Sequence, residues 1–231
     1  MKIRTDFVTN SSSSSFIFGK PKENDWTKER VFNIFKNTAD IAKVELKIID
    51  CKLENLDKEY YIEFKKYQAK LIDMEEHWVD VIFNQNGYST NKYNKLLYKF
   101  VDFTLFNKLI VEACKDSTER TGIDFEDLYT NTVHYNRILK IAVAKNIADI
   151  EEICQLKCID FRISEEYKEL TTDNNDWQEV MGWYDKLGAF EEHCFIDFGQ
   201  LAIYGCSEGC IPYCIVHELE KVAEYSCNHM G

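Results

Sequence analysis

DKEYYIEFKKYQAKLIDMEEHWVDVIF, residues 57–83, carries the clearest periodic pattern in this chain. Its apolar residues recur in alternating steps of four and three: Tyr60, Phe64, Tyr67, Leu71, Met74, Trp78 and Val81. Residues spaced in this way lie along one side of an α-helix, as they do in a heptad repeat. The stretch therefore predicts one long helix with an apolar stripe along its length.

A second helix is expected soon after the first. Asn86 and Gly87 favour a helix end, and Ser89 and Thr90 favour the start of another helix. Residues 91–115 contain enough leucine and phenylalanine to be apolar over more than half of a helix circumference. Two such helices joined by a short turn form an antiparallel hairpin. The heptad face of this hairpin offers a surface for a homodimer.

The rest of the chain predicts a mixture of strands and helices. Alternating or continuous apolar runs predict strands at 16–18, 44–48, 138–144, 159–163, 195–198 and 201–204. Helical spacing predicts helices at 25–37, 147–157, 176–187 and 212–225. A turn at Gly199 and Gln200 would join the last two strands as a hairpin. We therefore expect an α+β fold, with mixed sheet elements around a long antiparallel helical hairpin.

The beginning of the chain contains an uninterrupted run of serines: Ser11, Ser12, Ser13, Ser14 and Ser15. Residues 2–8 before the run and 16–18 after it contain apolar residues that suit short strands. Serine side chains hydrogen-bond to nearby backbone and favour turns. We therefore expect a strand, a polar loop over residues 9–15, and a second strand that returns into the fold.

The string KIRTDFVTNSSSSSF, residues 2–16, resembles the N-terminal tag of a group of uncharacterised proteins from clostridia and related bacteria. In that group the tag is a constant opening joined to dissimilar downstream sequences. The resemblance is limited to residues 1–18 and implies no activity for the remainder. It implies an enzyme or receptor that reads the tag, with the five serines as modification sites. The alternative is a solvated serine turn.

Composition indicates a folded protein in a reducing compartment. The 231 residues are 45% hydrophobic and include 15 Phe, 13 Tyr and 4 Trp. No apolar run reaches the roughly 18 residues of a membrane helix, and no secretory signal is visible, so we expect a cytoplasmic protein without membrane partners. Nine cysteines fit reduced thiols or a metal site better than a disulfide framework.

The polar stretch 116–122 is the best candidate for a boundary within the chain. It predicts three parts: the serine-tagged residues 1–18, a helix-rich part at 19–116 that holds the hairpin, and an acidic α/β part at 117–231. One continuous domain is the alternative, because a chain of this length can form a single core.

Charge is distributed unequally along the sequence. Residues 1–110 carry 18 Lys and Arg against 16 Asp and Glu, whereas residues 111–231 carry 10 against 24. Such an acidic half repels nucleic-acid backbones and anionic lipid, and it attracts proteins with basic surfaces. Ordinary solubility is the alternative explanation.

One cluster of residues has the chemistry of a metal site. Cys206, Cys210 and Cys214 are spaced by four residues, and His217 follows three residues later. Thiolate and imidazole are the ligands of a closed tetrahedral zinc site. The usual Cys-x2-Cys pairs of zinc ribbons are missing from the sequence, and buried cysteines are common in cores. Zinc is therefore the one cofactor that the sequence suggests, and no cofactor is the alternative.

The sequence contains no motif that identifies a catalytic residue. A Gly-x-Ser-x-Gly elbow, a Walker loop and a basic aromatic platform are all missing, which disfavours a hydrolase, a nucleotide enzyme and a nucleic-acid binder. Three hypotheses follow. The first is a non-enzymatic, acidic interaction protein, of phage or mobile-element origin, that binds or inhibits a basic partner. The second is a substrate whose serine tag is read or modified by a companion enzyme. The third is a zinc-dependent enzyme or zinc-stabilised domain.

Overall fold

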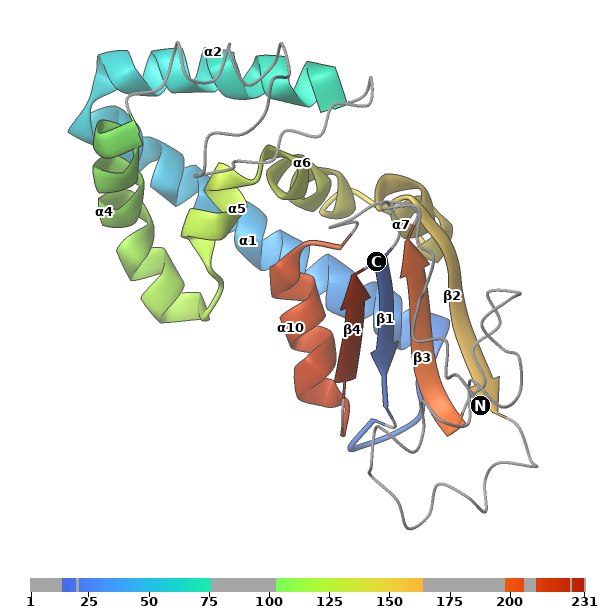
Figure 1. Ribbon diagram of the computed structural model, residues 1–231. Helices are drawn as coiled ribbons and strands as arrows, with labels where there is room; N and C mark the ends of the chain where they lie inside the picture. Colours follow the sequence, from blue (N-terminus) through green and yellow to red (C-terminus); the bar gives the residue numbers. More distant parts are fainter. Residues whose placement is uncertain are drawn as a thin grey trace, which may run out of the picture. The chain divides into compact units, whose positions relative to one another are not determined.

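A computed structural model describes residues 14–19, 21–75, 103–163, 198–205, 211–224 and 226–230 (Figure 1). The chain divides into two compact units. Unit 1 contains Met1–Thr38 and Val143–Gly231, and unit 2 contains Ala39–Ala142. Helix α1 (Lys28–Leu56) contributes its first residues to unit 1 and the remainder to unit 2. The stretch 116–122, chosen from the sequence as a boundary, lies at the end of α4 (Phe103–Thr121) and at Gly122.

Unit 1 contains a four-stranded sheet. Its strands are β1 (Ser14–Phe18), β2 (Leu156–Ile163), β3 (Phe198–Gly205) and β4 (Ser226–Met230), in the order β2-β3-β1-β4. Every pairing among these strands is antiparallel. The N-terminal strand β1 is thus paired on both sides, with Phe16 opposite Ile203 of β3 and Asn228 of β4. The described helices that lie wholly in this unit are α7 (Ile147–Ile153) and α10 (Tyr213–Val222).

The core of unit 1 contains side chains from both the sheet and the helices. Phe16 and Phe18 alternate with residues of the opposite face of β1, and both are buried. Trp26 packs against Phe18, and its indole Nε1–H donates a hydrogen bond of 2.7 Å to the carbonyl of Gly19. This contact fixes the chain between β1 and α1. The other buried apolar side chains include Leu201, Ile203, Ile211, Ile215 and Leu219.

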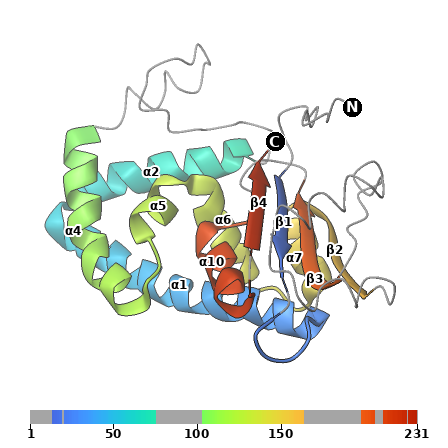
Figure 2. The same cartoon turned by 60° about the horizontal axis from the view of Figure 1, so that its bottom comes forward.

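Unit 2 consists of helices in its described part. Besides α1 and α4 it contains α2 (Lys58–Glu75), α5 (Phe125–Thr130) and α6 (Thr132–Ile141). Figure 2 shows α5 and α6 between α2 and the C-terminal part of α1. The buried residues of α1 in this unit follow helical spacing: Ala42, Leu46, Ile49 and Leu53. Asn131 ends α5 and also caps α6, where its side chain accepts a hydrogen bond from the backbone N–H of His134.

The predicted α+β fold with mixed sheet elements is wrong, because the described residues are mostly helical. Residues 44–48 lie within α1, and 138–144 cover the end of α6 and the turn after it. In residues 44–48 apolar and polar residues alternate as in a strand, although the segment is helical. This happens because α1 buries the polar Glu45 and exposes the apolar Val44 and Ile48. The predicted turn at 199–200 is also wrong, since β3 continues through it.

The predicted long antiparallel hairpin is wrong as an arrangement, although both of its helices exist. Helix α2 lies within the predicted 57–83 and α4 overlaps the predicted 91–115, while 76–83 and 91–102 lie outside the described residues. Figures 1 and 2 show α4 running across α2 rather than alongside it. Phe64 and Tyr67 of the predicted stripe are buried within unit 2. A homodimer through this stripe has no support, because its described aromatic residues pack inside their own unit.

Several other predictions are confirmed. Helix α7 lies within the predicted 147–157, β2 contains 159–163, β1 contains 16–18, and α10 begins directly after Pro212. The predicted helix at 25–37 is the start of the longer α1. Predictions for 2–8, 176–187 and 195–197 lie outside the described residues. Within the described part of the chain, no helix is both long and apolar enough to cross a membrane.

Candidate functional site

A polar cluster that joins several helices of unit 2 is centred on Lys65 of α2. The Lys65 ammonium donates hydrogen bonds to Gln68 Oε1 at 2.7 Å, to Tyr135 Oη at 3.0 Å and to Asp50 Oδ1 at 3.3 Å. The Tyr129 hydroxyl donates to the same Asp50 oxygen at 2.5 Å. These five residues, which we call the Lys65 cluster, lie on four helices: α1, α2, α5 and α6.

Aromatic packing holds the Lys65 cluster in place. The ring of Phe64 stacks on Tyr129 at 6.2 Å between centroids, and Tyr129 meets Tyr135 edge-on at 5.6 Å. Lys65 Nζ lies 4.8 Å from the centre of the Tyr135 ring and 5.9 Å from that of Tyr129, within the range of a cation–π interaction. The side chains of Lys65 and Asp50 are 27% and 23% exposed, so the charged pair is mostly withdrawn from water.

The environment favours protonated forms of the basic and phenolic groups. Burial by itself lowers the pKa of Lys65, but its interactions with Tyr135 and Asp50 outweigh burial and raise this pKa above its usual value. Burial raises the pKa of Tyr135, and Lys65 only partly opposes it. Burial and the Asp50 carboxylate together raise the pKa of Tyr129. At neutral pH Lys65 is therefore an ammonium, and Tyr129 and Tyr135 are neutral phenols.

This charge state determines what the Lys65 cluster can do chemically. A nucleophilic lysine needs a pKa lowered towards neutral pH, and a tyrosine base needs a lowered phenol pKa. Both shifts here run in the opposite direction. The nearby thiol of Cys114 in α4 is equally unreactive, because burial raises its pKa to about 12. The arrangement suits a charge-balanced clamp that joins four helices.

We expect the stability of the protein to fall as pH rises above about 10, where a free lysine begins to lose its proton. Lys65 has a higher pKa in the folded state, so its contribution is present below the unfolded pKa and is lost as pH rises through the folded pKa. The raised tyrosine pKa values act in the same direction. Urea unfolding at a series of alkaline pH values should show that the free energy of unfolding falls less steeply with pH for Lys65→Met than for the wild type. Equal slopes for the variant and the wild type would contradict this.

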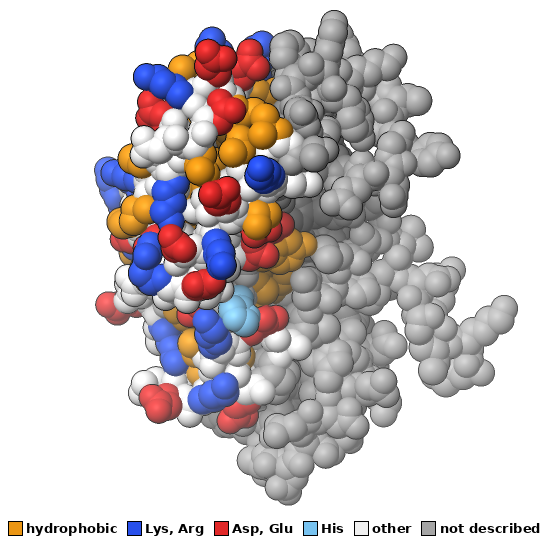
Figure 3. Space-filling model, turned by 90° about the vertical axis from the view of Figure 1, so that its left-hand side faces the viewer, with side chains coloured by type: hydrophobic (Ala, Val, Ile, Leu, Met, Phe, Trp, Pro, Cys, Tyr) orange, Lys and Arg blue, Asp and Glu red, His pale blue; other side chains and the backbone are white. Residues whose placement is uncertain are grey.

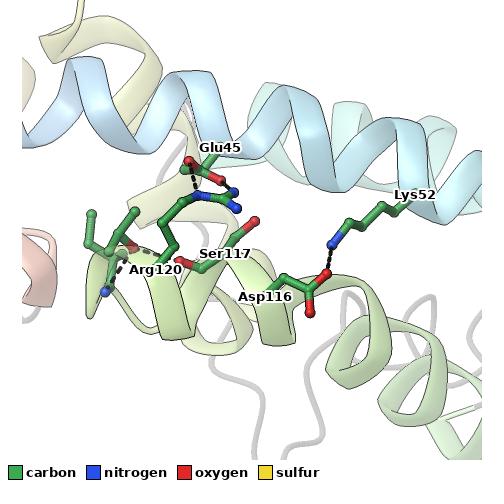
Figure 4. Close-up of polar contacts among 7 residues, drawn as sticks. Glu45, Lys52, Asp116, Ser117 and Arg120 are labelled. Atoms are coloured by element: carbon green, nitrogen blue, oxygen red, sulfur yellow. Dashed lines mark hydrogen bonds and ion pairs between the residues drawn. The ribbon is translucent and has the colours of Figure 1, made fainter.

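Two ion pairs join α4 to α1 in the same unit (Figure 4). Arg120 Nε donates to Glu45 Oε1 at 3.1 Å, and its Nη2 donates to Oε2, which makes the contact bidentate. The Ser117 hydroxyl lies beside the same carboxylate. Arg120 lowers the pKa of Glu45, although burial of Glu45 opposes this shift. The second pair, Lys52 Nζ to Asp116 Oδ2 at 2.6 Å, is more exposed to water.

The predicted zinc ligands are only partly within the described structure. Cys214 is half-buried in the first turn of α10, and His217 is exposed one turn later, with its Nδ1 3.6 Å from Glu220 Oε2. Cys206 and Cys210 lie outside the described residues. Among the residues that are described, no three His, Cys, Asp or Glu side chains are grouped so that they could hold a metal ion. The four-ligand zinc site stays a prediction.

The serine run is divided in the same way. Ser11, Ser12 and Ser13 lie outside the described residues, whereas Ser14 and Ser15 form the first part of β1 rather than the end of a loop. Ser15 pairs with Tyr204 on one side and with His229 on the other. A modifying enzyme would therefore find the backbone of these two serines already paired in the sheet. Modification of the five serines stays a prediction.

Sequence reasoning missed the Lys65 cluster. Its charged pair, Asp50 and Lys65, is separated by 15 residues, and Tyr135 follows Lys65 by 70 residues. No local motif joins these positions, because the cluster exists only once α5 and α6 lie against α2. No protein-family model, curated protein or solved structure matches this chain.

Proposed function

We propose that this chain is a non-enzymatic interaction protein of the cytoplasm, whose acidic part binds or inhibits a partner with a basic surface. The observation that carries the proposal is the location of the net charge. Residues 143–231 contain 18 Asp and Glu against six Lys and Arg, a net charge of −12. The remainder of the chain contains 22 of each kind, so residues 143–231 account for the entire formal charge.

All of these acidic residues belong to unit 1. In its described part Glu152 of α7 and Glu224 after α10 are exposed, and Glu151, Glu218 and Glu220 are half-exposed. A surface with one sign of charge steers oppositely charged proteins towards it and speeds their association. On the face in Figure 3, Lys and Arg are intermixed with Asp and Glu. The net acidic charge is a property of residues 143–231 of the sequence.

The chemistry of the Lys65 cluster supports the same proposal. Its lysine and tyrosines keep their protons at neutral pH, so the cluster has the properties of a stabilising contact rather than of a catalytic group. Binding through the acidic part requires no reactive residue, and its strength depends on charge complementarity and on salt.

Charge reversal in unit 1 tests the proposal. The wild-type chain and the variant Glu151→Lys/Glu152→Lys/Glu224→Lys are immobilised, and proteins from a lysate of the source cell are captured at low and at physiological salt. We expect a basic protein to be retained by the wild type, with affinity about tenfold lower for the variant because three surface contacts become repulsive. Retention should also weaken as salt increases.

A matched control separates this effect from a general change in charge. The variant Glu59→Lys/Glu63→Lys/Glu112→Lys makes the same change at exposed residues of unit 2. It should retain the partner as the wild type does. Equal loss in both variants, or retention that salt does not alter, would refute a specific role for the acidic part.

A further inference from the structure

We draw no further inference here: the strongest candidate, the buried side-chain amide of Gln68 in the Lys65 cluster of unit 2, whose Nε2 has no hydrogen-bond partner among the described residues, belongs to the site already described, and nothing in that part of the structure shows what would occupy the space beside it.

Discussion

The substitution Asp50→Ala should lower the free energy of unfolding by about 3 kcal/mol, the cost of leaving one charge of a buried pair without its partner. Asp50 accepts hydrogen bonds from both Lys65 and Tyr129, and its side chain is only 23% exposed. The variant keeps the Lys65 ammonium close to the rings of Tyr129 and Tyr135 but removes the carboxylate that it pairs with. Urea unfolding at neutral pH, followed by circular dichroism, measures the change.

A double-mutant cycle isolates the interaction between Asp50 and Lys65. Lys65→Met alone should cost less, because Asp50 still accepts the Tyr129 hydrogen bond. The double variant Asp50→Ala/Lys65→Met should be more stable than the sum of the single effects by about 1–3 kcal/mol, since neither charge is then left alone. The size of this coupling distinguishes a clamp from two unrelated contacts.

The control is Asp116→Ala, which removes the carboxylate of an exposed ion pair. It should change the stability very little, because water screens such pairs. If Asp50→Ala were no more harmful than Asp116→Ala, the Lys65 cluster would have no structural role. The comparison would then favour a role for Asp50 and Lys65 in binding rather than in stabilising the fold.

Helix α1 shows why part of the fold could be predicted from the sequence and part could not. In the neighbouring helix α2 the apolar residues Phe64 and Tyr67 are buried, which is the usual relation between hydrophobicity and burial. Helical spacing therefore predicted α2 correctly. In α1 that relation fails around Glu45, which is buried by its contact with Arg120, 75 residues away, while Val44 and Ile48 face outward. The resulting alternation imitates a strand.

The Lys65 cluster could not be predicted from the sequence for a related reason. Lys65 and Gln68 lie on one helix and Tyr129 and Tyr135 follow on two others, so their contacts depend on how the helices pack. In sequence, a lysine beside an apolar stripe predicts an exposed side chain, as most helical lysines are.

The substitution Phe18→Ala should destabilise unit 1 by about 3–5 kcal/mol, the usual cost of removing a buried phenylalanine ring. Phe18 is 1% exposed in β1, which is paired with strands on both sides. Its ring lies 6.5 Å from those of Phe16 and Trp26. The cavity left by alanine would therefore lie between the sheet and the segment that leads into α1.

Urea unfolding followed by tryptophan fluorescence measures this loss, because Trp26 contacts the altered ring. Tyr213→Ala is the control, since it removes an aromatic side chain that is 45% exposed on α10 and should cost far less. Similar effects of the two substitutions would mean that β1 is not part of the core. A large loss for Phe18→Ala alone would show that the strand that begins with Ser14 and Ser15 is structurally required. The serine run would then be fixed to the fold at its C-terminal end.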